Sequence, residues 1–370
     1  MKIALVSPYD FSHIGGVNNH IIQLEKHFLR MGHDVRILAP RSRRGVAVPN
    51  LIALGRAFPV PSGGSMARIT FSLWLGPRVK KVMEAEAFDI AHLHEPLTPF
   101  LPALVLMRAQ CPKVGTFHAC HQAPRGYGLT KPILSSWFQR LDGLAAVSVP
   151  ARDFVARHFP GDYEIVPNGV DLALFRRETP PLEDFREGKN LLFVGRLEKR
   201  KGLDYLLGAL ARIRKQRKDV RLIVVGPGTY LRENYEAMAR EIGGVHFAGL
   251  VPAEDLPRYY ASAHVFCAPA TGEESFGLVL LESMAMAKPI VASSIAGFAH
   301  LVTQGQEGVL VPPKDEEALA RAILELLENP AQAQAMGDRG WEKAQSYSWQ
   351  SIADKTLAFY RRHSVGAPRP

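Results

Sequence analysis

The sequence predicts an α/β protein built from two Rossmann-like, doubly wound domains that face a central cleft. Short strand-like runs alternate with amphipathic helical segments from end to end, as in the βαβ units of parallel sheets. The alternation stops at a polar, Pro-rich passage, 176–189, and then restarts. A chain of 370 residues is also longer than one ordinary α/β core. We therefore expect one domain over 1–170 and a second over 171–347.

The expected strands follow one another in both halves of the chain. In the first half they lie near 2–7, 34–39, 89–94, 113–118, 143–149 and 163–167. In the second half they lie near 190–195, 220–226, 245–248, 264–268, 289–293 and 308–311. A last helix is expected at about 348–362. Because ligands of such sheets bind outside the carboxyl ends of the strands, the loops after the strands are where functional residues are expected.

Composition narrows the class of protein. The chain carries 45 Lys and Arg against 36 Asp and Glu, a formal charge of +9. Such a balance permits a nucleic acid, an anionic membrane or a phosphorylated substrate as partner. The aromatic interleaving typical of single-stranded nucleic-acid binders is missing, so no nucleic-acid partner is expected. No run approaches the roughly 18–20 apolar residues of a membrane span.

The compartment is predicted from the N-terminus and the cysteines. Residues 1–8 are too short in apolar residues for a signal peptide and are typical of a first strand. Cys111, Cys120 and Cys267 are few, odd in number and not in metal-ligand spacing. A reduced cytoplasm is therefore expected.

The most informative stretch is 272–285, which contains two carboxylates eight residues apart, Glu274 and Glu282. If a helix starts near Phe276, both lie on nearly one face, with Glu274 in the loop before it. The free N–H groups of that helix end form an anion site. The arrangement would suit a sugar, a diphosphate and a ribose. Judged by spacing alone, a surface helix with two solvated glutamates is the alternative.

Two further loops carry features of phosphate binding. Gly15 and Gly16 follow the first strand and open a helix, where a diphosphate can approach the backbone closely. Arg196 and Lys201 flank a turn directly after a strand of the second half. Two cations there would neutralise a leaving diphosphate. The alternatives are a simple tight turn and a solvated basic loop.

Histidines concentrate at strand ends. Strand alternation places His92 and His94 on one face, which raises the alternative of a zinc site. The Cys, His and carboxylate set needed to complete such a site is not evident, so no metal is predicted. His118 ends a strand just before a loop, and we predict that it bonds a hydroxyl of the sugar or of the acceptor.

The segment 74–86 predicts an amphipathic helix with Arg78, Lys80 and Lys81 outside its apolar stripe. This is the composition of an interfacial basic helix, although an ordinary surface helix has the same periodicity. Arg68 and other cations lie in the same half of the chain.

The whole 272–285 string resembles the Glu-x7-Glu motif of retaining, nucleotide-sugar-dependent glycosyltransferases with the GT-B fold. Over nearly its full length the chain is similar to one branch of them, the bacterial phosphatidylinositol mannosyltransferases. The similarity is carried by Pro8-Tyr9 with Gly15-Gly16-Val17, Arg78–Lys81, Phe88–Pro96, Thr116-Phe117-His118, Pro167–Asp171, Gly195–Gly202 and the Glu274–Glu282 string. In such proteins the final helix, here about 348–370, crosses back to the first domain.

The resemblance implies a role for each matched position. It places the donor diphosphate on Gly16, Arg196 and Lys201, the hexose on Glu274, and the ribose on Glu282. The phosphates also meet backbone amides, and the base meets the 250–252 loop, so the remaining donor contacts are Gly15, Val251, Pro252, Ser275, Phe276, Gly277 and Leu278. The acceptor side would be lined by Tyr9, Asn18, Ser62, Gly63, Arg68 and His118.

Departures from the family pattern lie on the acceptor side. Position 18 is Asn where the family favours Gln, positions 62–63 are Ser-Gly where bulkier polar residues are common, and the 119–130 loop differs. The acceptor headgroup is therefore less determined than the donor chemistry. A second lipid or a small polyol remains an alternative acceptor.

The resemblance implies a retaining hexosyltransferase that moves mannose from GDP-mannose to phosphatidylinositol at the inner face of the membrane. With no evident protein nucleophile, front-face attack is expected, with Arg196, Lys201, Glu274 and His118 as the catalytic set and no essential metal or cofactor. A UDP-hexose donor remains open. Two other classes compete: a nucleotide-sugar epimerase, which acts without an acceptor, and a non-catalytic basic binding protein, which does not need these residues.

Overall fold

The computed structural model describes residues 1–13, 15–42, 48–62, 65–72, 74–119, 127–272 and 274–364. Packing divides the chain into two units. The first contains Met1–Asn168 and the C-terminal segment that starts at Trp349, and the second is Gly169–Ser348. The boundary therefore lies after residue 168, two residues before the position expected from the sequence. Residues 365–370 of the expected last segment lie outside the described residues.

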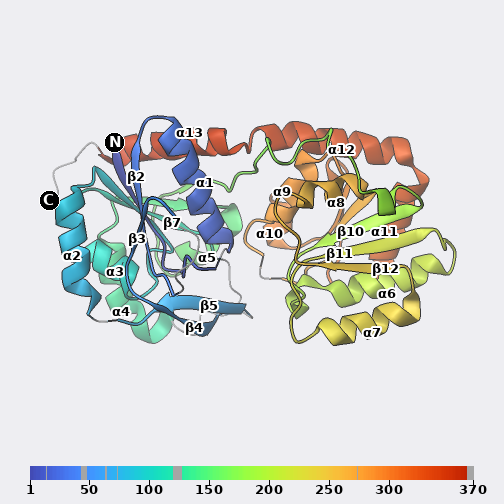
Figure 1. Cartoon of the computed structure of the whole chain (residues 1–370), viewed down its shortest axis with the longest axis horizontal. Coiled ribbons are helices and arrows are strands. Elements are labelled where there is room, and N and C mark those ends of the chain that lie inside the picture. Colours follow the sequence, from blue (N-terminus) through green and yellow to red (C-terminus); the bar gives the residue numbers. More distant parts are fainter. Residues whose placement is uncertain are drawn as a thin grey trace. The chain divides into compact units, whose positions relative to one another are not determined.

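The first unit is built around a parallel sheet with strand order β3-β2-β1-β6-β7-β8-β9 (Figure 1). Every neighbouring pair in it is parallel. Its strands are β1 Lys2–Val6, β2 Asp34–Ala39, β3 Leu51–Ala53, β6 Ile90–His94, β7 Lys113–Phe117, β8 Gly143–Ala146 and β9 Tyr163–Ile165.

Helices cover both faces of this sheet, because successive side chains of a strand point to opposite sides. On β1, Ile3 and Leu5 pack with α1 and α13, whereas Ala4 and Val6 pack with α2 and α3. Figure 1 shows α2 and α3 side by side. The helices are α1 Gly16–Arg30, α2 Leu75–Glu86, α3 Leu101–Arg108, α4 Tyr127–Phe138, α5 Val149–Ala156 and α13 Trp349–Ser364.

The strands β3, β4 (Ala57–Ser62) and β5 (Ser65–Thr70) were absent from the sequence-based prediction. β4 and β5 form a separate antiparallel pair. β3 has only three residues, and β4 contains Pro59 and Pro61. Proline cannot donate to a strand ladder, so β4 does not have the pattern of a central strand.

The second unit repeats the design with strand order β12-β11-β10-β13-β14-β15, again parallel. On β10, Leu191 and Phe193 face a core formed with α6 and α11. Its elements are β10 Lys189–Val194, α6 Leu203–Arg214, β11 Val220–Val225, α7 Arg232–Ile242, β12 Val245–Gly249, α8 Leu256–Ser262, β13 Val265–Ala268, α9 Leu278–Ala285, β14 Ile290–Ser293, α10 Ala296–Ala299, β15 Gly308–Val311, α11 Glu316–Glu328 and α12 Pro330–Gln345. Two 3-10 turns, Glu183–Phe185 and Lys199–Lys201, precede β10 and α6.

Both sheets have a topological switch point, where strand order reverses. It lies between β1 and β6 in the first unit and between β10 and β13 in the second. Loops diverge at such a point, so the carboxyl ends of the flanking strands border an open crevice where ligands bind. Several of the residues singled out from the sequence follow strands at or beside these points: Tyr9, Gly15 and Gly16 follow β1, His118 follows β7, Arg196 and Lys201 follow β10, and Glu274 follows β13. Within the described ranges, no helix has both the length and the apolar character of a membrane span.

Candidate active site

The glutamate-containing loop of the second unit joins β13 to α9. The helix begins at Leu278, two residues later than expected, because Gly277 takes a left-handed conformation with φ 88°. Glu274 therefore lies four residues before the helix, and Glu282 lies within it. Gly297 makes this path possible, since a Cβ there would lie 1.7 Å from the backbone oxygen of Glu274.

Glu274 is the anion at the centre of a charged network. Its Oε1 lies 2.6 Å from both Lys201 Nζ and Arg200 Nη1. Arg200 Nε also lies 3.0 Å from Glu198, whose other oxygen lies 3.1 Å from Arg196 Nη1. The loop after β10 and the loop after β13 are thus held together by three cations and two carboxylates. The cations outnumber the anions, so the network favours an incoming anion.

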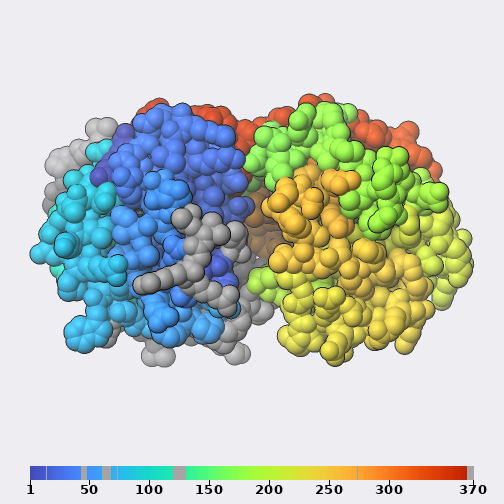
Figure 2. Space-filling model, viewed as in Figure 1, coloured from blue at the N-terminus to red at the C-terminus, as the bar shows by residue number. Residues whose placement is uncertain are grey.

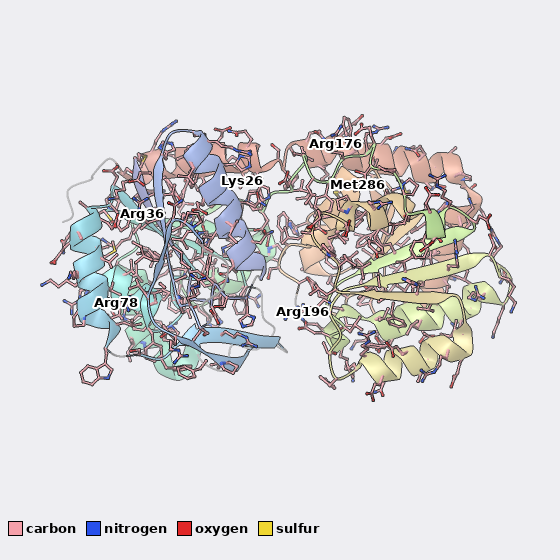
Figure 3. The ribbon with its side chains drawn as sticks, viewed as in Figure 1. Lys26, Arg36, Arg78, Arg176, Arg196 and Met286 are labelled. Atoms are coloured by element: carbon pink, nitrogen blue, oxygen red, sulfur yellow. The ribbon has the colours of Figure 1, made fainter. Side chains whose placement is uncertain are left out.

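Arg196 is the accessible member of this network. Its side chain is 49% exposed, whereas Lys201 is 18% and Arg200 20% exposed. Figure 3 labels Arg196 at the end of β10. Gly202 allows the two loops to approach, because a Cβ there would lie 2.0 Å from the carbonyl oxygen of Pro269. Arg200 was not singled out from the sequence. Its pairing spans 74 residues of chain, which spacing does not reveal.

Glu282 occupies a different environment. Its Oε2 accepts a 2.7 Å hydrogen bond from the hydroxyl of Tyr260 on α8. Burial raises the pKa of Glu282 to about 7, although the Tyr260 hydrogen bond lowers it. Tyr260 is fully buried and also was not predicted. Glu282 is therefore a desolvated acceptor with one of its oxygens already oriented.

The remaining donor contacts expected in the β12–α8 and β13–α9 loops lie on the same unit. Ser275 and Phe276 precede α9, and Phe276 is buried with its ring 5.3 Å from that of His300. A contact of Phe276 with a ligand would therefore use its backbone. Val251 is half-buried and Pro252 exposed in the loop between β12 and α8. The ligand roles assigned to these residues remain predictions.

In the first unit, Gly15 and Gly16 lie exposed at the N-terminus of α1. The first turn of α1 contains no acidic residue, so its free N–H groups and dipole favour an anion. Asn18, in the same first turn, is only 3% exposed. Its Oδ1 accepts from the Ser7 hydroxyl at 2.7 Å, and its Nδ2 donates to backbone carbonyls of Asp10 and His13, both at 3.0 Å. Asn18 would therefore serve the acceptor side by holding this loop.

Tyr9 and Arg68 come together from distant parts of the first unit. Tyr9 forms a backbone bridge with Ile69, and the Asp10 N–H donates to the carbonyl of Arg68 at 2.9 Å. Arg68 is exposed on β5. Ser62 lies in β4, and its side chain is not described. Gly63 lies outside the described residues.

His118 belongs to a cluster of four imidazoles in the first unit. As predicted, His92 and His94 share a face, with ring centroids 4.2 Å apart. His94 Nδ1 lies 2.9 Å from His118 Nε2, and the ring of His20 on α1 lies 5.2 Å from His94 and 5.0 Å from His118. Desolvation lowers the pKa of all four, to about 4 for His20 and about 3 for His92. The cluster is therefore neutral near pH 7.

A carboxylate fixes the backbone of His118. Glu95 Oε1 accepts from the N–H groups of His118 and Ala119 at 2.7 and 2.8 Å. Glu95 has φ 51°, a strained value for a non-glycine residue. Neither Glu95 nor His20 was singled out from the sequence, because the loops after β6 and β7 meet only in the folded sheet. No group of three metal-ligating side chains is found in the ranges that the structure covers.

The helix α2 corrects one expectation. Its apolar residues Val79 and Met83 are buried against the first sheet, so the apolar stripe of 74–86 faces the core and not an interface. Arg78, Lys80 and Lys81 are exposed, and Lys80 lies 3.7 Å from Glu84. Figure 3 labels Arg78 on α2, whose light-blue atoms lie at the surface of the first unit in Figure 2. 

One apolar group remains available beside these cations. Trp74, the residue before α2, is 90% exposed. Phe71 is 45% exposed nearby in the chain. A cationic helix face preceded by an exposed indole has the features of a membrane-surface contact.

Comparison with known proteins agrees with this geometry. Residues 14–174 match the family model described as Glycosyltransferase Family 4, and residues 188–329 match that of Glycosyl transferases group 1. The phosphatidyl-myo-inositol mannosyltransferase of Mycobacterium leprae is 36% identical over 367 residues, covering 97% of this chain and 96% of the relative. That of Propionibacterium freudenreichii is 34% identical over 97% of this chain and 94% of its own. A glycogen synthase of Mycobacterium tuberculosis is 30% identical, covering 100% and 97%.

Solved structures agree on the fold. Sucrose-phosphate synthase from Thermosynechococcus elongatus superposes with a TM-score of 0.76 at 25% identity, covering 98% of both chains. Anabaena Alr3699/HepE in complex with UDP and glucose superposes with a TM-score of 0.78 at 21% identity, covering 98% of this chain and 100% of that one. The two Rossmann-like parallel sheets are those of GT-B glycosyltransferases, as predicted.

Proposed function

The chain belongs to the phosphatidyl-myo-inositol mannosyltransferase family of group 1 glycosyltransferases, and we propose that it transfers mannose from GDP-mannose to phosphatidylinositol with retention of anomeric configuration. The observation that carries this proposal is the network of Arg196, Lys201 and Glu274 at the switch point of the second sheet. A nucleoside diphosphate needs cations, and a hexose needs a fixed acceptor of hydroxyl hydrogen bonds. This network contains both.

In the proposed donor complex, Arg196 and Lys201 bind the diphosphate. Lys201 is already paired with Glu274 at 2.6 Å, so the phosphate displaces or shares that contact and leaves Glu274 with acceptor capacity for hexose hydroxyls. Glu282 accepts from the ribose hydroxyls, with the Tyr260 hydroxyl fixing the orientation of the carboxyl. The chain itself thus provides the positive charge that a divalent cation supplies in other transferases, and no metal is needed.

The proposed step is front-face displacement. The acceptor oxygen forms a bond to the anomeric carbon on the side from which the diphosphate leaves, while the bond between that carbon and the phosphate oxygen breaks. The hydroxyl proton passes to the departing diphosphate oxygen. Cations stabilise the growing charge on this leaving group, and positioning of the two reactants supplies the rest of the rate enhancement.

We place the reaction at the cytoplasmic face of an anionic membrane, to which the protein attaches peripherally. Arg78, Lys80 and Lys81 form an exposed cationic face, and Trp74 adds an apolar anchor. Three cations contribute about 1 kcal/mol each near an anionic surface, which gives reversible, salt-sensitive attachment. Arg68 is exposed in the same unit and would contact the lipid phosphate.

Vesicle binding tests this attachment. Changing Arg78, Lys80 and Lys81 to Ser should weaken sedimentation with phosphatidylinositol vesicles and lipid mannosylation, with donor affinity unchanged. The matched control changes three exposed cations of the second unit, Lys215, Lys218 and Arg321, to Ser. Equal binding to neutral and anionic vesicles, or full activity of the α2 variant on vesicles, would refute the attachment.

A further inference from the structure

The hydrogen bond between His94 and His118 determines which hydrogen-bonding group His118 can offer. His94 Nδ1 lies 2.9 Å from His118 Nε2, so one of these nitrogens carries the shared proton. His94 is 0% exposed and His118 is half-buried. Neutral imidazole has one donor and one acceptor nitrogen. Which of the two rings donates in this hydrogen bond therefore determines whether the other nitrogen of each ring is a donor or an acceptor.

The surroundings of His94 decide between the two arrangements. His94 Nε2 is buried and has no hydrogen-bond partner among the described residues. If His118 donated to His94 Nδ1, His94 would carry its own proton on Nε2 and bury an N–H donor without a partner. Orphaned buried N–H groups are rare and costly. If His94 donates instead, the orphan is only a lone pair. Desolvation excludes the third arrangement, a doubly protonated His94, because it holds the pKa of His94 well below its usual value.

We propose that His94 is a positioning residue that donates its Nδ1–H to Nε2 of His118, so that His118 carries its own proton on Nδ1 and presents it to a substrate hydroxyl. This inference rests on the proposed transfer reaction. Glu95 accepts hydrogen bonds from the backbone N–H groups of His118 and of Ala119. Glu95 thus fixes the backbone position of His118. His94 determines that the Nδ1 of His118 carries the proton.

The hydrogen bond from His94 also limits how His118 can take part in the proposed transfer. Within the described residues His118 Nδ1 makes no hydrogen bond, and Nε2 is already occupied by His94. With a proton on Nδ1, His118 cannot accept the acceptor's hydroxyl proton at either nitrogen. His118 is therefore a hydrogen-bond donor that orients a hydroxyl of the sugar or acceptor, and the departing diphosphate remains the proton acceptor.

His92 provides a matched control. It lies on the same strand, is 1% exposed, and its ring contacts that of His94. Its own hydrogen bonds go to Thr116 Oγ1 and to the hydroxyl of Tyr360, both at 2.7 Å. Replacing His92 therefore removes a buried imidazole of the cluster without removing the partner of His118.

The test is nitrogen NMR of the ligand-free protein at neutral pH, with the His118 signals assigned by their loss in His118→Gln. The wild type should show His118 protonated on Nδ1. His94→Leu should lose this tautomer preference, whereas His94→Asn, whose amide can donate from a similar position, and His92→Leu should keep it. Protonation of His118 on Nε2 in the wild type would overturn the proposal, and this result needs no variant to fold.

Kinetics of the same proteins provide the second readout. His94→Leu should lower kcat for transfer at least about tenfold with donor affinity unchanged, and His94→Asn should restore part of it. Unchanged kcat in His94→Leu, or an equal loss in His92→Leu, would overturn the positioning role. Because the tautomer is measured without substrate, a failure of the proposed reaction leaves that measurement intact and is recognised separately, by absence of transfer in the wild type.

Discussion

The carboxyl edges of the two sheets present opposite kinds of chemistry. In the second unit, Arg196, Arg200 and Lys201 interact with Glu198 and Glu274 in a charged, partly exposed network. In the first unit the corresponding edge holds buried imidazoles, whose pKa values desolvation lowers. The same topology therefore supports one edge that neutralises charge and another that forms hydrogen bonds without charge.

This difference has a physical reason. A diphosphate needs compensating cations, which stay charged only where water or counter-ions solvate them. A hydroxyl needs a hydrogen-bond donor or acceptor of fixed direction. Burial around His94 and His118 limits the protonation states that these imidazoles can adopt. The charged edge suits the donor leaving group and the neutral edge suits a hydroxyl. Replacing residues of one edge should therefore affect only the step of the reaction assigned to that edge.

Removing the cations of the second unit should have the largest effect. Arg196→Ala combined with Lys201→Ala should lower kcat/KM for transfer by about 100- to 1,000-fold, because the leaving diphosphate loses its charge stabilisation. Steady-state kinetics with GDP-mannose measure it. Lys199→Ala, an exposed cation of the same loop, is the control. Comparable losses in the control, or nearly normal transfer in the double variant, would contradict the role of the network.

His118→Ala should reduce transfer by about 100-fold while donor affinity changes little, because the side chain is assigned to orienting a hydroxyl. Equilibrium titration with a GDP-mannose analogue measures the affinity, and product formation measures the transfer. An equal loss of both would place His118 in donor binding. Unchanged kinetics would return His118 to a structural role.

The two glutamates should differ in the step that they affect. Glu282→Ala should weaken donor binding by about 1–3 kcal/mol, because a buried hydroxyl pair loses its acceptor. Glu274→Ala should mainly lower turnover, since positioning of the hexose matters most in the transition state. Calorimetry and kcat at saturating donor separate the two effects. Near-normal turnover of Glu274→Ala at saturating donor would contradict its assignment.

The smallest expected effect is a dependence of donor affinity on pH. Burial raises the pKa of Glu282 from 4.5 to about 7, so its proton is held in the free protein below that pH. Ribose hydroxyls donate to the ionised form, and donor affinity should therefore rise with pH up to about 7 and then level off. Tyr260→Phe removes the hydrogen bond that lowers this pKa, so the midpoint should move to higher pH. If the donor affinity of Glu282→Gln varied with pH as much as that of the wild type, ionisation of Glu282 would not be the cause.

The raised pKa of Glu282 also makes the free energy of unfolding depend on pH. A carboxyl whose folded pKa is raised favours the folded state while it is protonated. This contribution is present below about 4.5 and is lost as pH rises through about 7. The unfolding free energy of the wild type should therefore fall relative to that of Glu282→Gln across this window, as measured by denaturant titration.

The sequence predicted the charged edge more completely than the neutral one. Gly195–Gly202 and 272–285 are contiguous strings, and their positions after strands identified Arg196, Lys201, Glu274 and Glu282. Their partners Arg200 and Tyr260 were missed because the pairs join residues 74 and 22 positions apart. Propensity and spacing report local order, and these contacts exist only once loops of neighbouring strands meet.

The neutral edge was predicted only in part. Alternation placed His92 and His94 together, and the position after a strand identified His118. His20 was missed because it lies on α1, and Glu95 because its contacts are with backbone N–H groups 23 and 24 residues away. The fold itself followed from alternation, apart from β3 and the Pro-containing pair β4 and β5. The helix α2 was predicted, but the surroundings of its apolar face were not. An apolar stripe predicts a buried face, and periodicity does not distinguish a protein core from a membrane.

Transfer of labelled mannose tests the central claim most directly. The intact protein is incubated with phosphatidylinositol vesicles and GDP-mannose in the presence of a chelator, with UDP-glucose as the parallel donor, and the anomeric configuration of the lipid product is determined. We expect α-linked mannosyl phosphatidylinositol from GDP-mannose, formed without added metal. No lipid product from GDP-mannose, transfer from UDP-glucose alone, or activity that a chelator abolishes and manganese restores would contradict the account.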